Sequence, residues 1–185
     1  MKKIFLLPIV AMLFLASACE KEDSLDPLPV KDAGQYVRLD ITNKVFAHDH
    51  MDATVFGGEL TTPGNKVQKY ELFVRRTNSN GIVVGNYVQL LTVESFPAEL
   101  SITPQMIATA LGINVADMAQ GEVYRFLGYS YGFDGQVINY NNLSATVKAQ
   151  AGMKQGYKFM TTSVLDDYFP SHTIDGVFGY DNYQL

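Results

Sequence analysis

Six aromatic residues gather between positions 124 and 140, and they offer the clearest binding chemistry in the sequence. They are Tyr124, Phe126, Tyr129, Tyr131, Phe133 and Tyr140. Sugar rings stack on flat aromatic faces, and nearby side-chain amides complete such sites with hydrogen bonds. Alternation along a strand places Tyr129 and Tyr131 on one face, opposite to Tyr124 and Phe126. The predicted glycan-binding residues are Tyr129, Tyr131, Phe133, Tyr140 and Asn141.

A purely structural interpretation of the same aromatic residues stays open. Aromatic side chains are favoured in strands in general, and alternation directs half of them into a core. The sequence also contains no Trp, which argues against a dedicated sugar platform.

Two polar clusters contain groups that bind metal ions. The first carries imidazole and carboxylate groups, which suit zinc: His48, Asp49, His50 and Asp52. The second carries oxygen ligands, which suit calcium: Asp134, Asn139, Asn141 and Asn142. The second spacing does not match an EF-hand, and Asn and Asp are common in turns. We therefore interpret both clusters as polar loops and predict neither a metal site nor a cofactor.

Catalytic signatures are missing from the sequence. It has no Gly-x-Ser-x-Gly motif and no glycine-rich phosphate loop. Glycoside hydrolysis would need two carboxyl groups about 5–9 Å apart across a cleft. The candidates are Glu59, Glu71, Glu94, Glu99, Glu122 and Asp134. A small sandwich offers little cleft, so we predict that the protein is not an enzyme.

The elements that position these residues are mostly strands. Alternating apolar residues predict strands over 35–41, 53–60, 67–76, 83–93, 96–102, 122–131, 137–140 and 157–164. Asn80-Gly81 and Asp134-Gly135 predict hairpin turns. One helix is predicted, with Thr103 as its N-cap, Pro104 in its first turn and Gly112 at its end. The sequence therefore predicts an all-β, immunoglobulin-like β-sandwich with one short helical crossover.

Two details of these strands can be predicted. Gly57 and Gly58 interrupt a strand and indicate a bulge or a close approach of neighbouring backbones. In the 83–93 strand, strict alternation would place one set of side chains on a common face: Tyr87, Gln89, Leu91 and Val93.

The N-terminus has the organisation of an export signal. Lys2 and Lys3 precede an apolar stretch over residues 4–18. This stretch is shorter than the about 20 residues that a membrane-spanning helix needs. The small residues 16–18 lead directly to Cys19, the only cysteine. This arrangement resembles the lipobox of bacterial lipoproteins, which implies that Cys19 becomes the mature N-terminus and carries acyl chains such as palmitate.

The residues that follow Cys19 form a second candidate targeting signal. Lys21, Glu22 and Asp23 resemble the surface-export signal of Bacteroidota lipoproteins, although an acidic linker would have the same composition. We predict a signal peptide over 1–18, a lipidated flexible tether over 19–34, the β-sandwich over 35–164 and an irregular, aromatic-rich tail over 165–185. The 14 Lys and Arg against 19 Asp and Glu give a net charge of −5, so we expect no nucleic-acid partner.

Several segments together resemble a known group of proteins. They are the 67–76 strand, Phe96-Pro97-Ala98-Glu99-Leu100 and Gly132-Phe133-Asp134-Gly135. With the lipobox, they resemble small accessory surface lipoproteins of Bacteroidota found beside SusC/SusD-like glycan-uptake systems. The resemblance implies a non-catalytic, lipid-anchored protein on the outer-membrane surface that binds glycan or docks on a TonB-dependent transporter and a SusD-like lipoprotein. The alternative is a fimbrial or adhesive structural subunit.

Overall fold

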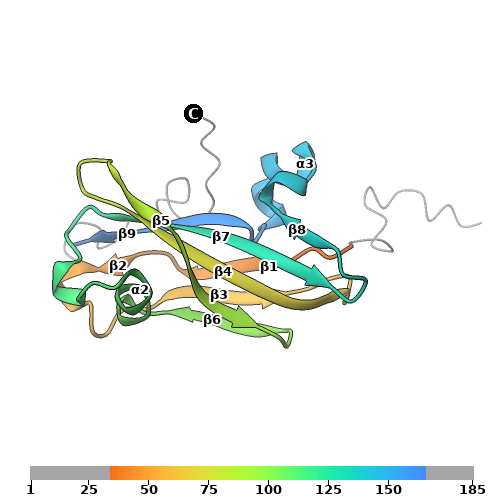
Figure 1. The fold of residues 1–185 in the computed structure, drawn as a ribbon, viewed down its shortest axis with the longest axis horizontal. Coiled ribbons are helices and arrows are strands. Elements are labelled where there is room, and N and C mark those ends of the chain that lie inside the picture. Colours follow the sequence, from red (N-terminus) through yellow and green to blue (C-terminus); the bar gives the residue numbers. More distant parts are fainter. Residues whose placement is uncertain (1–33, 166–185) are drawn as a thin grey trace, which may run out of the picture. The chain divides into compact units, whose positions relative to one another are not determined.

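The computed structural model describes residues 34–165, which form two β-sheets and a few short helices (Figure 1). The strands are β1 (Arg38–Asn43), β2 (Phe46–Ala47), β3 (Phe56–Thr61), β4 (Val67–Thr77), β5 (Val83–Val93), β6 (Ala98–Ile102), β7 (Val123–Gly132), β8 (Val137–Asn139) and β9 (Lys158–Val164). The α-helices are α2 (Pro104–Leu111) and α3 (Ala145–Ala149). Single 3-10 turns are η3 (His48–His50), η4 (Val115–Asp117), η5 (Tyr140–Asn142) and η6 (Ala151–Met153).

The two sheets differ in size. The small sheet has the order β1-β3-β6 and is antiparallel throughout. The large sheet has the order β2-β9-β7-β4-β5, and β8 pairs with β7. Its pairings are antiparallel except for β2 with β9, which is parallel. The predicted all-β sandwich with a short helical crossover is confirmed, and α2 lies in the connection between β6 and β7.

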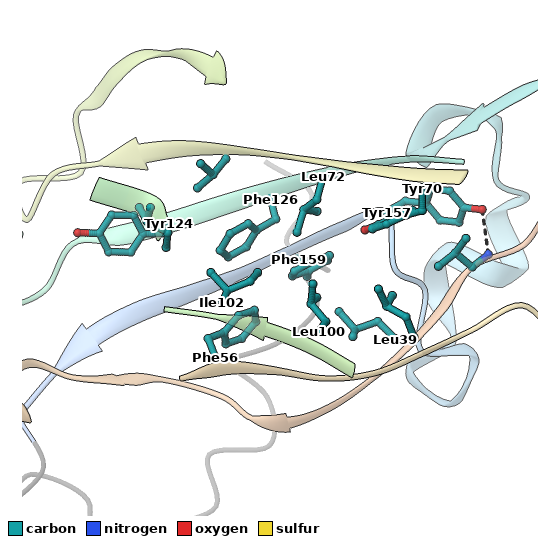
Figure 2. Close-up of a cluster of buried hydrophobic side chains, with 14 of the residues drawn as sticks. Leu39, Phe56, Tyr70, Leu72, Leu100, Ile102, Tyr124, Phe126, Tyr157 and Phe159 are labelled. Atoms are coloured by element: carbon teal, nitrogen blue, oxygen red, sulfur yellow. Dashed lines mark hydrogen bonds between the residues drawn. The ribbon is translucent and has the colours of Figure 1, made fainter. Parts of the chain in front are cut away.

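The hydrophobic core fills the space between the sheets. Phe56 on β3 stacks on Phe126 of β7, with ring centroids 5.4 Å apart, and Phe126 stacks on Phe159 of β9 at 5.0 Å. Figure 2 shows these rings between strands of both sheets. Aromatic pairs of this kind add about 0.5–1.5 kcal/mol beyond the area that they bury. The period-2 pattern produces this core because it directs every second residue of β4 and β7 inward.

The small sheet depends on two glycines of β3. A Cβ built on Gly57 would lie 1.7 Å from the Leu100 carbonyl oxygen on β6, and one on Gly58 would lie 1.8 Å from the Asp40 carbonyl oxygen on β1. Side chains at these positions would therefore collide with the backbones of both neighbouring strands. The predicted close approach at Gly57-Gly58 is confirmed.

The predicted helix forms as its capping residues indicate. Thr103 Oγ1 accepts the Met106 backbone N–H at 3.3 Å, and Pro104 is the first helical residue. Gly112 ends the helix with a left-handed φ of 68°. The sequence did not predict α3, which has five residues and an N-cap at Ser144. A helix this short contains too little of a 3.6-residue period to be recognised.

The predicted common face of the 83–93 strand is wrong. Leu91 lies opposite the buried Leu72, but the next partner pair is Gln89 with the outward-facing Phe73, because the register shifts there. The shift leaves Leu90 as an extra residue. A bulge of this kind reverses the alternation beyond it, so Gln89 and Leu91 lie on opposite faces.

Candidate functional site

The side of the large sheet that faces away from the core carries the candidate site, and we call it the outer face. Odd-numbered residues of β4 between Lys69 and Arg75, and odd-numbered residues of β7, point to this side, because their even-numbered neighbours from Tyr70 to Val74 and from Tyr124 to Ser130 are buried. Tyr129 lies opposite Glu71 of β4 and opposite Asn139 of β8. Tyr131 lies opposite Lys69 and Val137. The register thus brings residues of three strands together.

One end of the outer face is organised around Glu71. Lys69 Nζ donates to Glu71 Oε1 at 2.8 Å, and the Tyr131 hydroxyl donates to Oε2 at 2.7 Å. The Lys69 ammonium also lies 4.2 Å from the centroid of the Tyr131 ring. The hydrogen bonds from Lys69 and Tyr131 lower the pKa of Glu71, and the bond to Glu71 raises the pKa of Tyr131 to about 12. Both groups therefore keep their charge states at neutral pH and fix the orientation of the Tyr131 ring.

The middle of the outer face carries further rings. Tyr129 packs edge-to-face against Phe73 of β4, with centroids 5.4 Å apart and planes at 79°. Next to Phe73, the Arg75 guanidinium lies 4.5 Å from the centroid of the Tyr87 ring on β5. Rings on β4, β5 and β7 thus lie on this face with polar groups beside them, and sugars bind through such a combination of groups.

The other predicted glycan-binding residues lie at the β7–β8 end of this face. Phe133 follows β7 in the turn and is 72% exposed. Tyr140 lies in η5 and packs partly against the core, and its ring lies 5.0 Å from the Lys148 ammonium and 5.2 Å from that of Lys158. Asn141 is exposed, and its backbone N–H donates to Asn139 Oδ1 at 2.9 Å. Tyr140 is therefore less available to a ligand than the sequence suggested.

The two clusters considered for metal binding use their polar groups locally. His48 Nδ1 lies 3.1 Å from Ser163 Oγ, whereas His50 lies 3.8 Å from Asp49. Asn139 and Asn142 accept backbone N–H groups of their own turn. Within residues 34–165 no group of three or more His, Cys, Asp or Glu side chains is arranged to hold a metal ion.

A shallow hollow lies on the other sheet. It measures about 380 Å³ and is lined by Thr42, Gly58, Glu59, Pro97, Ala98 and Glu99. Glu59 of β3 pairs directly with Glu99 of β6. Like charges placed opposite each other destabilise a sheet, and this hollow lacks the aromatic rings of the outer face. The outer face is therefore the better candidate for a glycan.

Sequence reasoning missed Phe73, Arg75 and Tyr87 as parts of the site. The alternation of the 67–76 strand does place Phe73 and Arg75 on the face opposite to Tyr70 and Leu72. It could not show that this face continues onto Tyr129, because the register between two strands that lie far apart in the sequence is not a local property.

The predicted lipidation site Cys19 and the export residues Lys21, Glu22 and Asp23 lie outside the described residues. Among the described residues, none of the helices has the length and hydropathy required to cross a membrane. Comparisons with protein-family models, with curated proteins and with solved structures find no match to this sequence.

Proposed function

We propose that this protein is a non-catalytic surface lipoprotein whose outer face binds a glycan. One observation carries the proposal: β4, β5, β7 and β8 bring aromatic rings and hydrogen-bonding groups onto one solvent-facing side of a rigid sheet. A site on regular strands holds its groups more firmly than a site on loops. Tyr129 and Tyr131 are the proposed stacking residues, and Asn139 and Glu71 are the polar groups beside them.

We further propose the immunoglobulin-like variety of sandwich. Its known strand order has ABE(D) in one sheet and GFC in the other, with C′ added beside C in variable-type domains. The order β1-β3-β6 and β9-β7-β4-β5 corresponds to A-B-E and G-F-C-C′. This correspondence supports the proposal. In this arrangement the outer face belongs to the GFCC′ sheet.

The glycan proposal is tested by binding measurements on the full chain. Tyr129→Ala removes a ring from the centre of the face, and we expect it to weaken oligosaccharide binding at least about tenfold, since ring contacts of this size contribute over 1 kcal/mol. The matched control is Ile82→Ala, which removes an exposed apolar side chain from the β4–β5 hairpin. Calorimetric titration with hits from a glycan microarray measures both. Equal loss in both variants, or none in either, would contradict the proposed face.

We also propose that Cys19 anchors the protein to the outer membrane, that residues 21–23 direct it to the cell surface, and that it is an accessory of a SusC/SusD-like uptake complex. Cys19→Ala should release the protein from membranes and abolish labelling with a palmitate analogue. Mild crosslinking of intact cells, followed by a pull-down, should recover a TonB-dependent transporter and a SusD-like lipoprotein. Recovery of the chain alone would contradict the uptake role.

A fimbrial or adhesive subunit is the second candidate, because β5 forms an edge. Within the described residues β5 pairs only with β4, and the start of this hairpin strand exposes Ile82, Val83 and Val84 by 61%, 47% and 43%. An exposed apolar edge can accept a strand from another chain. Crosslinked ladders of the chain that dissociate only on heating would favour this function over glycan uptake.

A further inference from the structure

The described residues expose large apolar side chains at two places, which lie at opposite ends of the large sheet (Figure 1). At the turn between β7 and β8, Phe133 is 72% exposed and Val137 is 43% exposed. The other place is the β4–β5 hairpin, where Ile82 is the most exposed, at 61%. β4 runs from one end to the other, and its 11 residues cover roughly 33 Å at about 3.3 Å per residue.

The described chain begins at the Phe133 end of the sheet. The Gln35 side-chain amide donates a hydrogen bond to Asp134 Oδ1 in the β7–β8 turn. The Gln35 carbonyl oxygen accepts the Ser130 hydroxyl of β7 at 2.9 Å. These bonds hold the start of the described chain beside the turn. The segment that leads back to Cys19 therefore departs from the same end of the domain that exposes Phe133.

This connection distinguishes the two apolar ends. The proposed acyl groups on Cys19 would bring the Phe133 end to a lipid surface, and the Ile82 end would lie farther away. Cys19 precedes Gln35 by 16 residues, which extend to at most about 55 Å. One exposed ring binds a bilayer weakly by itself, but a linker of this length makes its insertion an intramolecular step with a high effective concentration.

The turns at this end carry little charge, which suits a lipid interface. The Phe133 backbone N–H donates to the Lys66 carbonyl oxygen at 3.3 Å, so the β3–β4 turn lies beside the β7–β8 turn. Residues 62–66 and 132–137 contain one basic and one acidic side chain, those of Lys66 and Asp134. These turns are therefore neutral together, although the whole sequence has a net charge of −5. A neutral end approaches anionic headgroups without the repulsion that an acidic surface would meet.

We propose that the β7–β8 turn of the anchored protein contacts the membrane, with the Phe133 ring inserted among the lipid headgroups. The inference rests on the proposed acylation of Cys19 and adds a second membrane contact, which sets the orientation of the domain. In this orientation the Ile82 hairpin points away from the membrane. Tyr129 and Tyr131 remain on the outer face for the proposed glycan, whereas Phe133 has a different role.

The test measures which end of the acylated full chain lies in the membrane. The protein is reconstituted in vesicles of phosphatidylethanolamine and phosphatidylglycerol, and flotation shows whether the vesicles retain it. Gln136→Cys places a thiol for an NBD label in the exposed part of the β7–β8 turn, close to Phe133. Asn80→Cys is the matched control in the exposed β4–β5 hairpin. Cys19 is the only natural cysteine, and its lipid blocks the sulfur, so the label is specific.

A lipid with a nitroxide near its headgroup quenches a label that enters the interface. We expect at least about threefold more quenching at position 136 than at position 80, because only the β7–β8 turn is inserted. Phe133→Ser should remove most of the quenching at 136 while the acyl chains keep the protein on the vesicles. Phe133→Leu keeps an apolar side chain and should retain the quenching. Ile82→Ser removes a similarly exposed side chain from the opposite end and should leave the quenching unchanged.

The outcomes separate the membrane contact from the anchor on which it rests. A protein that does not float with the vesicles has no lipid anchor, and this result overturns both proposals. Flotation with equal quenching at positions 136 and 80 supports the anchor and overturns the contact. Quenching at 136 that survives Phe133→Ser overturns the role of the ring. If Phe133→Ser does not fold, the two labels on the chain that keeps Phe133 still decide which end contacts the membrane.

Discussion

Arg76 and Glu122 form an ion pair at the edge of the core, between the end of β4 and the start of β7. Arg76 Nη2 donates to Glu122 Oε1, and the Tyr124 hydroxyl donates to Oε2 at 2.7 Å. The side chains are 18% and 2% exposed. Arg76 Nη2 also donates to the Asp117 carbonyl at 3.0 Å, so the pair joins β4 and β7 to η4. The hydrogen bond to Glu122 raises the pKa of Arg76 above its ordinary value.

Loss of the Glu122 carboxylate should destabilise the fold strongly. Glu122→Ala leaves the Arg76 charge largely buried without its partner and removes the acceptor of the Tyr124 hydroxyl. Breaking a buried pair in this way costs about 3–5 kcal/mol. Urea unfolding measures the loss. The control is Glu94→Ala, an exposed carboxylate just after β5, which should change stability by less than about 0.5 kcal/mol. Similar losses in both variants would show that the pair does not carry the effect.

Gly57 should not tolerate any side chain. Its φ is +152°, and a Cβ would lie 1.7 Å from the Leu100 carbonyl oxygen. Gly57→Ala therefore forces β3 away from β6, and we expect a loss of about 3 kcal/mol or more, the upper range for overpacked sites. Gly152→Ala is the matched control, because no atom lies within 4 Å of its built Cβ. Thermal melts should show a large fall in Tm for the first variant and little change for the second.

The sequence predicted the core well because period 2 is a local property. Alternation separates Tyr70, Leu72 and Val74 of β4 from their neighbours, and it places Tyr124 and Phe126 of β7 on one face; all five side chains are buried. The prediction failed in β5, where the bulge at Leu90 depends on pairing with β4 and not on the strand's own sequence. The second helical turn that the sequence indicates over 115–120 is present as η4, whereas α3, η3, η5 and η6 were missed, since one turn of helix is too short to show a period.

The candidate site was predictable only in part, for a related reason. Tyr129 and Tyr131 could be placed on one face from alternation alone. Their neighbours on this face include Glu71, Phe73 and Asn139. These neighbours depend on the register of β7 with β4 and β8, which cannot be predicted from the sequence of one strand. The partly buried position of Tyr140 likewise depends on tertiary packing beneath η5.

The Tyr157 hydroxyl should contribute measurable stability. Tyr157 lies directly before β9, and its hydroxyl contacts the segment that leads into β1. It donates to the Gln35 carbonyl at 2.7 Å, accepts the Val37 N–H at 2.9 Å and lies 2.9 Å from Ser130 Oγ. Tyr157→Phe leaves the buried Val37 N–H without its acceptor, which costs about 1–3 kcal/mol. Tyr129→Phe, at a partly exposed position on the outer face, is the matched control and should change stability by less than about 0.5 kcal/mol. Urea unfolding of both variants checks the difference, and equal losses would contradict it.

The buried tyrosines should make the fold sensitive to alkali. Burial is the main cause that raises the pKa of Tyr157 from 10.0 to about 12, and it also raises the pKa values of Tyr36, Tyr70 and Tyr124. Above pH 10 the unfolded chain releases these phenol protons while the folded chain retains them. The unfolded state then binds fewer protons, so the free energy of unfolding falls as pH rises.

This stability is fully present below pH 10 and is lost as the pH rises toward 12. Each retained proton contributes a slope of about 1.4 kcal/mol per pH unit in that window. Urea unfolding between about pH 8 and pH 11 measures the slope, and tyrosinate absorbance follows ionisation directly. Tyr157→Phe should flatten the slope above pH 10, because it removes one of the contributing phenols. A free energy of unfolding that stays constant to pH 11, with all tyrosines ionising together near 10, would show that these side chains reach solvent in the folded protein.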